Sequence, residues 1–387
     1  MSNGQKSEQQ LQHVTEDEAA LYDRQIRLWG LEAQTRIRKA HILIVNLEGL
    51  TTECIKNLVL AGIASLTIVD FREKCQESDL SAGFFWREED IGGERLGPAA
   101  ARMQVLNPLV SIRVLPTSSF DSVLDPSSSV LKDLHVDTVV VNVPSGPASL
   151  SPRWSKESLV AISAHCRALE IPFYIAGTTG FNGWIFADLG AQHDYVKELD
   201  NPIAVKAETN GDGSASASAD KPTSGPVTKR YEKRTQDFVE LGTAVGMTWK
   251  GATRAETRKA RLSPGLFGVW ALWELAANGD GQRGPSADEL QKAALTIMED
   301  KGVDATMPFQ LHNTAPKEFF DSLALSVSVP GEFSPTCAIL GGVLAQNILN
   351  ALGGREEPIA NWFQLDGLSC LGVIHSLGTK PSVLTPA

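Results

Sequence analysis

The chain has 387 residues, of which 42% are hydrophobic and 21% are charged, and its formal net charge is −11. This composition is ordinary for a folded protein, and the net negative charge argues against nucleic acid as the main partner. Single cores seldom grow beyond about 250–300 residues, so the length predicts one large domain with a smaller one inserted or appended.

The cysteines indicate neither a disulfide framework nor a zinc site. Five are scattered along the chain without a Cys-x-x-Cys pair: Cys54, Cys75, Cys166, Cys337 and Cys370. Such an odd, unpaired set predicts a reducing compartment. The N-terminus has no apolar core for export, and no apolar run approaches the ~20 residues of a membrane span. We therefore expect an intracellular soluble protein without a metal site.

The first helix is expected to turn an arginine away from its packed face. Residues 1–14 are polar and predicted to be disordered, and Thr15 to Glu18 form a capping box where a helix can begin. An apolar stripe follows at helical spacing: Tyr22, Ile26 and Trp29. Arg24 lies roughly 200° around the helix from the start of this stripe, so a solvated arginine is the plain interpretation.

The next stretch has the pattern of a βαβ unit. The apolar run His41–Leu47 predicts a buried parallel strand, Glu53–Ala61 has helical spacing, and Ser65–Asp70 predicts a second strand. In a nucleotide-binding unit of this type, glycines let the backbone approach the phosphates, and an acid about 20 residues later binds the ribose. Asp70 has the right spacing and lies at the end of a strand, so it is a candidate for that acid.

The turn of this unit lacks most of the expected glycines. Its sequence runs from Asn46 to Thr51, and only the middle glycine of the motif, Gly49, is present. Glu48 would place a negative charge where a phosphate should lie. The sequence therefore predicts the scaffold of a nucleotide site with a damaged phosphate cradle, and Gly49 and Asp70 are only weak candidates for cofactor binding.

The remaining segments predict an α/β fold with a Rossmann-like, mostly parallel sheet and an inserted helical lobe. The first part of the main domain covers residues 15–195, the polar stretch 196–228 is expected to be a disordered linker, and 229–325 is expected to be the helical lobe. Residues 326–387 return to the main domain with an apolar helix from Cys337 to Leu352. Two strands follow.

Two features in these later segments have more than one interpretation. The basic run Lys229–Arg234 is either a nuclear localisation signal or a solvated charge cluster. Gly341 and Gly342 would each cost the last helix about 1 kcal/mol relative to Ala unless close packing requires them. Close packing is the interpretation that the apolar surroundings favour.

Three blocks, Tyr22–Gly30, His41–Asp70 and Pro335–Gly367, resemble the adenylation domain of the enzymes that activate ubiquitin-like proteins. More narrowly, they resemble the smaller, non-cysteine subunits of the heterodimeric SUMO-activating enzymes. This resemblance implies a pair of homologous halves, in which the degenerate half lends an N-terminal arginine to the ATP site of the complete half. Arg24 matches that arginine, and Arg27 is a weaker candidate that could equally be a structural ion-pair partner.

The departures from a complete half support this assignment. Asn46 and Thr51 replace glycines, Arg95 replaces a lysine, and no aspartate follows the strand that ends at Val143. The resemblance therefore implies that Mg-ATP is bound mainly by a cysteine-bearing partner subunit, with a SUMO-type modifier as substrate, in the nucleus and also in the cytoplasm. Cys337 is expected to be a buried small hydrophobe and not the thioester cysteine.

Other functions remain open at this stage. The small subunit of a Rub/Nedd-type activating enzyme is the nearest alternative, although that relative is longer. The βαβ pattern with Asp70 would also suit an NAD-dependent oxidoreductase, but the missing glycines and the lack of a placed proton donor argue against it. A purely scaffolding protein is the third alternative.

Overall fold

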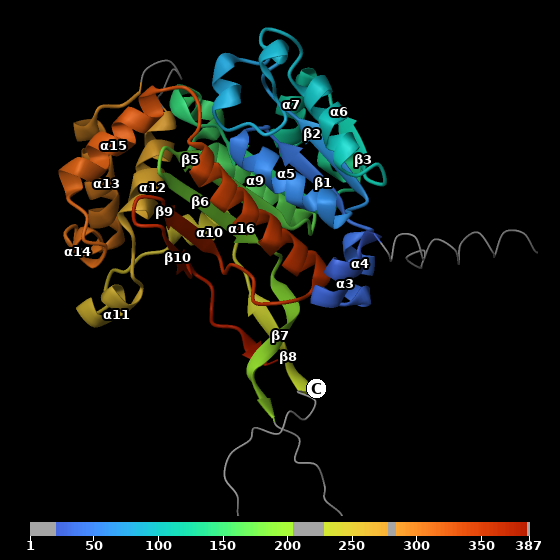
Figure 1. The fold of residues 1–387 in the computed structure, drawn as a ribbon. Coiled ribbons are helices and arrows are strands. Elements are labelled where there is room, and N and C mark those ends of the chain that lie inside the picture. The colour runs from blue at the N-terminus through green and yellow to red at the C-terminus, as the bar shows by residue number, and fades with distance from the viewer. Residues whose placement is uncertain (1–20, 204–227, 278–283, 385–387) are drawn as a thin grey trace, which may run out of the picture.

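The structure is a computed structural model that describes residues 21–203, 228–277 and 284–384. The predicted disordered segment 1–14 and the capping box from Thr15 to Glu18 lie outside these residues. Figure 1 shows a central sheet with helices on both faces and a long two-stranded ribbon that extends away from the body.

The central sheet has eight strands in the order β10-β9-β6-β5-β4-β1-β2-β3. Its strands are β1 (His41–Val45), β2 (Ser65–Val69), β3 (Ser111–Val114), β4 (Thr138–Val143), β5 (Phe173–Thr179), β6 (Asn182–Asp188), β9 (Trp362–Asp366) and β10 (Leu371–His375). Strands β3, β2, β1, β4 and β5 are parallel, whereas β6, β9 and β10 continue the sheet in antiparallel pairing. The predicted α/β fold with a mostly parallel sheet is confirmed.

One face of the sheet is covered by α5 (Gly49–Ala61), α6 (Leu96–Leu106) and α16 (Ser334–Gly353). α16 packs against α5 and against α4 (Leu31–Ile37), which follows the short helix α3 (Asp23–Trp29). Alternate residues of the strands point into this layer, as the two-residue period of a strand requires.

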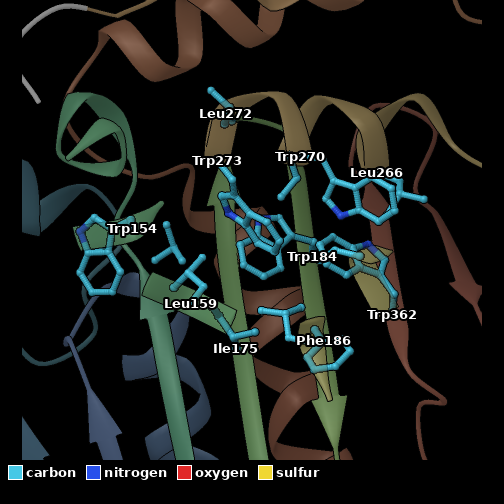
Figure 2. Packing of buried hydrophobic residues seen from close by; sticks show 14 of the residues in the cluster. Trp154, Leu159, Ile175, Trp184, Phe186, Leu266, Trp270, Leu272, Trp273 and Trp362 are labelled. Carbon is cyan, nitrogen blue, oxygen red and sulfur yellow. The ribbon is translucent and has the colours of Figure 1, made fainter. Parts of the chain in front are cut away.

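The opposite face is covered by α9 (Lys156–Ala168), α12 (Pro264–Ala276), α13 (Ala287–Lys301) and α15 (Pro316–Ser328). Four tryptophan rings join the sheet to α12: Trp184 stacks on Trp362 at 5.2 Å between centroids, and Trp270 and Trp273 contact Trp362 edge-on. Figure 2 shows these rings between the helix and the strands. The helical lobe therefore shares one core with the sheet and is not a separate body.

The short helices complete the described chain. They are α7 (Phe120–Leu124), α8 (Val130–Leu134), α10 (Leu241–Gly246), α11 (Arg254–Lys259) and α14 (Met307–Leu311), with one-turn 3₁₀ segments at Glu77–Ser81, Glu88–Asp90, Thr117–Ser119, Gly146–Leu150 and Pro152–Trp154. The α10 to α15 region contains the helices that the sequence predicted for the lobe.

The ribbon corrects two of the predicted boundaries. β7 (Gln192–Ile203) and β8 (Thr228–Asp237) pair in antiparallel fashion, and β11 (Val383–Leu384) adds to β8. Residues 196–203 are thus strand and not linker, and the lobe region begins with a strand that contains Lys229–Arg234. The prediction failed because charged residues are spread along both strands, which leaves no apolar period to detect. The rest of the predicted linker, 204–227, lies outside the described residues.

α16 also differs from one expectation. Within the described ranges it is the one helix that is long and apolar enough to cross a membrane by length and composition, but 56% of the tested window is buried inside the protein. Its apolar surface covers α5 and the sheet, as expected for the core helix of a folded domain.

Candidate functional site

Arg24 lies exposed on α3. No hydrogen bond or ion pair joins its guanidinium to another residue that the structure describes. Its neighbour Arg27 pairs with Asp23 at 3.0 Å on the same helix. α3 and α4 precede the amino end of β1, whereas the βαβ turn follows its carboxyl end, so Arg24 lies away from the turn of its own chain.

The α3 segment is anchored by the residue just before it. Tyr22 is buried, and its hydroxyl accepts a hydrogen bond of 2.8 Å from the Asn107 side chain. Gly62 leaves the room for this ring, because a Cβ there would lie 2.4 Å from the Tyr22 hydroxyl. The sequence predicted that Tyr22 faces the protein and that Arg24 does not, and both exposures agree.

Side chains replace the two missing glycines of the βαβ turn. Asn46 adopts the left-handed backbone conformation, with φ of 70°, and its amide donates to the Asn142 carbonyl at 2.9 Å. Asparagine tolerates this conformation better than most residues. Thr51 is fully buried, and its hydroxyl accepts from the Glu48 N–H at 2.8 Å. The turn is therefore well formed and closed by its own side chains.

The sequence suggested that Glu48 would place a negative charge in the phosphate position, but its carboxylate is instead held by a partner within the chain. Glu48 is buried at the N-cap of α5, and its carboxylate pairs with Arg72. Burial raises the pKa of Glu48 to about 7; Arg72 opposes this shift and Glu332 adds to it.

Asp70 is occupied entirely within the chain. It accepts hydrogen bonds of 2.8 Å from the backbone N–H groups of Leu47 and Arg72 and of 2.9 Å from the Arg95 guanidinium. Its side chain is fully buried. Asp70 therefore ties the turn to the sheet and offers no free oxygen to a ribose.

Arg95, which stands where a complete half has a lysine, is also fully buried. It pairs with Asp70 at 2.9 Å and with Asp79 at 2.8 Å, and its guanidinium lies 4.1 Å from the centre of the Trp86 ring. Because arginine forms rigid, bidentate contacts with carboxylates, this side chain cross-links two segments and is not available to a ligand.

One residue of this site could not be identified from the sequence. Glu332 belongs to the connection between α15 and α16, and its Oε2 accepts the N–H of Gly49, the first residue of α5. Its Oε1 accepts from the Thr178 hydroxyl at 2.7 Å and from the Cys337 thiol at 3.3 Å. Glu332 is 283 positions from Gly49 in the sequence, and a single acid after Pro330-Gly331 gives no local signal.

A cavity of about 330 Å³ lies beside this turn. Its charged lining residues are Glu48, Asp79, Glu332 and Arg72. Three carboxylates and one guanidinium make the lining acidic, which is the wrong sign for a polyphosphate.

The comparisons with known proteins agree with the resemblance. The ThiF family model matches residues 22–377. The chain belongs to the ThiF family. It is similar to the proteins named SUMO-activating enzyme subunit 1 of Rattus norvegicus, 32% identical over 95% of this chain and 96% of that protein, and of Homo sapiens, 31% identical over 95% and 97%. Among solved structures, E. coli MccB aligns with a TM-score of 0.48 at 10% identity, over 93% of this chain and 72% of that one.

Membership of the ThiF family places the chain among the E1-like adenylating proteins. The nucleotide and Mg²⁺ that this chemistry requires do not fit the turn of this chain. Glu332 holds the Gly49 N–H, and the neighbouring lining is acidic. The described residues also contain no group of three or more His, Cys, Asp or Glu side chains that could hold a metal ion.

The thiols of this ThiF-family chain are mostly buried. Burial raises the pKa of Cys75 to about 11 and that of Cys166 to about 12, and it raises the pKa values of Cys54 and Cys337 still further. A nucleophilic cysteine needs the opposite shift, towards the thiolate. Cys370, the exposed one, lies in the turn between β9 and β10.

Proposed function

We propose that this chain is the regulatory, non-cysteine subunit of a heterodimeric SUMO-activating enzyme. A cysteine-bearing partner subunit binds Mg-ATP, adenylates the C-terminus of the SUMO-type modifier and takes it as a thioester, while this chain supplies Arg24 in trans. One observation carries the proposal: Arg24 is exposed and unengaged by any described residue, whereas the chain's own nucleotide turn is closed by Glu332.

The chemistry gives Arg24 a clear task. Attack of the modifier's carboxylate on the α-phosphate of ATP spreads negative charge over the phosphoryl oxygens. A guanidinium is charged at all physiological pH values, and it stabilises such charge when it is brought across an interface. Arg27 is less suited to this task, because Asp23 already neutralises it.

The exposed side chains around α3 support the proposal that another protein binds there. Large apolar side chains are exposed on four adjoining helices of one face: Leu28, Leu31, Leu60 and Ile339 are 78%, 54%, 46% and 44% exposed. These helices, α3, α4, α5 and α16, pack against one another. Exposed apolar side chains gathered on one face are typical of interaction surfaces.

Nuclear location, with the cytoplasm as a second place, is part of the proposal. The basic run Lys229–Arg234 lies on β8, in the ribbon that extends from the body. A nuclear localisation signal has to be accessible to its import receptor, and a position in this ribbon is consistent with that requirement. Fusion of a fluorescent protein to the chain, with and without Lys229→Ala and Lys233→Ala, tests whether this run directs import.

ATP–pyrophosphate exchange tests the division of labour. We expect no exchange by the chain alone and full exchange with the partner and modifier. Arg24→Ala should reduce exchange by the complex about 100-fold or more without separating the subunits. Arg27→Ala, on the same exposed helix, is the matched control and should change the rate less than about threefold.

Two results would contradict the proposal. Exchange by the chain alone would show that its own turn binds ATP, and an unaffected Arg24→Ala complex would make the chain a scaffold. A Rub/Nedd-type modifier as the preferred substrate would keep the mechanism but select the alternative subunit.

A further inference from the structure

The connection between α15 and α16 is fixed across the carboxyl end of the sheet. Ser145 donates to the Gly331 carbonyl at 3.1 Å, and the Glu332 N–H donates to the Ser81 hydroxyl at 3.0 Å. Gly331 has φ of 101°, which suits a glycine at this turn. The backbone of Glu332 is thus held on both sides, and its side chain is directed at the start of α5.

The Glu332 carboxylate has the coordination of a bound anion. It accepts donors from three elements: the Gly49 N–H of α5, the Thr178 hydroxyl of β5 and the Cys337 thiol of α16. The first N–H groups of a helix in this position of a βαβ unit are the ones that hold phosphate in nucleotide-binding folds. Here a carboxylate of the same chain takes the place of the phosphate.

The surviving glycine of the turn fits this carboxylate closely. A Cβ at Gly49 would lie 2.7 Å from Glu332 Oε2 and 2.6 Å from the Ala82 Cβ. Contact with an internal side chain is therefore a sufficient physical reason for glycine here, without any ligand. The same residue that suggested a phosphate site from the sequence is explained by Glu332.

We propose that Glu332 is the resident anion of the α5 turn, a tethered carboxylate that closes the position to phosphoryl ligands and fastens the start of α16 to α5. A tethered group competes with a free ligand as if it were present at on the order of millimolar concentration or more, so cellular phosphates do not displace it. Glu48, one position before Gly49, pairs with Arg72, so the guanidinium in the cavity lining is already engaged within the chain. The inference explains how the proposed regulatory subunit stays free of nucleotide.

Inorganic pyrophosphate is the probe for this position, titrated into the chain alone at constant ionic strength with thermal unfolding and calorimetry as measurements. The wild type should show no response. Glu332→Ala should bind pyrophosphate with a Kd in roughly the millimolar range, and Glu48→Gln combined with Glu332→Ala should bind about tenfold tighter, because the Arg72 guanidinium in the cavity lining loses its carboxylate partner. Glu318→Ala, an exposed acid on α15, is the matched control and should behave as the wild type.

A folded Glu332→Ala chain that ignores pyrophosphate, or a wild type that binds it equally well, would overturn the proposal. If Glu332→Ala does not fold, Glu332→Gln decides through amide hydrogen exchange. The neutral amide is a weaker acceptor, so the Gly49 N–H should exchange at least about tenfold faster than in the wild type. Unchanged exchange overturns the proposal. Both measurements use the chain alone, so absence of a partner or of Arg24-dependent activity would refute the proposed function without changing this result.

Discussion

Arginines at α3 and at the α5 turn differ in what their guanidinium groups contact. Arg95 is fully buried between Asp70 and Asp79, and Arg72 pairs with Glu48. Arg24 is exposed, and its guanidinium makes no hydrogen bond or ion pair with a described residue. Residue type alone therefore does not separate a structural cation from a functional one. What separates them is whether the N–H donors of the guanidinium are satisfied within the chain.

The largest effect should come from removing a buried, structural cation. Arg95→Met keeps an apolar side chain over Trp86 but removes the buried guanidinium from Asp70 and Asp79, which leaves Arg72 as the cation beside them. Breaking a buried pair in this way costs about 3–5 kcal/mol of unfolding free energy. Urea denaturation measures it, and Arg24→Ala, as the exposed counterpart, should change stability by less than about 0.5 kcal/mol. Equal effects of the two substitutions would refute the distinction between the sites.

The second prediction concerns the pH dependence of stability, which reports on Glu48 in the closed turn. Burial raises the pKa of Glu48 from its ordinary value of 4.5 to about 7; Glu332 and Asp70 add to the shift, and Arg72 and Arg95 oppose it. Between these two pH values the folded chain binds more protons than the unfolded chain, so stability falls as pH rises through this window.

Glu48→Gln removes this titration, so its stability relative to the wild type should grow as the pH rises from about 4.5 to about 7, by on the order of 2 kcal/mol. Denaturation at a series of pH values provides the measurement. A stability difference that stays constant across the window would show that Glu48 does not titrate as described.

The third prediction concerns two adjacent glycines of α16, Gly341 and Gly342. A Cβ at Gly341 would lie 2.5 Å from the Glu53 Cβ and 2.6 Å from the Leu50 carbonyl oxygen, whereas no atom lies within 4 Å of a Cβ at Gly342. Close packing therefore explains Gly341 but not Gly342. Gly341→Ala should lower stability by about 1–3 kcal/mol, and Gly342→Ala should raise it by up to about 1 kcal/mol.

The proposed partner subunit gives Gly342 a second test. If a neighbouring subunit packs closely on this part of α16, Gly342→Ala should weaken the heterodimer although it stabilises the isolated chain. Calorimetric titration with the partner measures the affinity of the heterodimer separately from the stability of the isolated chain. A heterodimer of unchanged affinity would place the interface elsewhere on the helical face.

The sequence predicted what local patterns encode. Buried apolar runs predicted the strands around His41–Val45 and Thr138–Val143, the stripe that includes Tyr22 predicted an outward Arg24, and the missing glycines predicted a damaged turn. It could not predict the β7–β8 ribbon, because charged residues lie along both strands. It also could not predict Glu332, since contacts between residues 283 positions apart follow from the tertiary fold and not from any period.

The tryptophans between α12 and the sheet have a practical consequence. Trp184, Trp270 and Trp273 each contact Trp362, and Trp184 also contacts Trp273, so the group joins the sheet to the inserted helices. Aromatic rings held in one fixed arrangement give a near-ultraviolet circular dichroism signal that disappears when the packing loosens. The molecule therefore carries a built-in optical reporter, which shows without any label whether the packing of α12 on the sheet is retained when the proposed partner subunit binds.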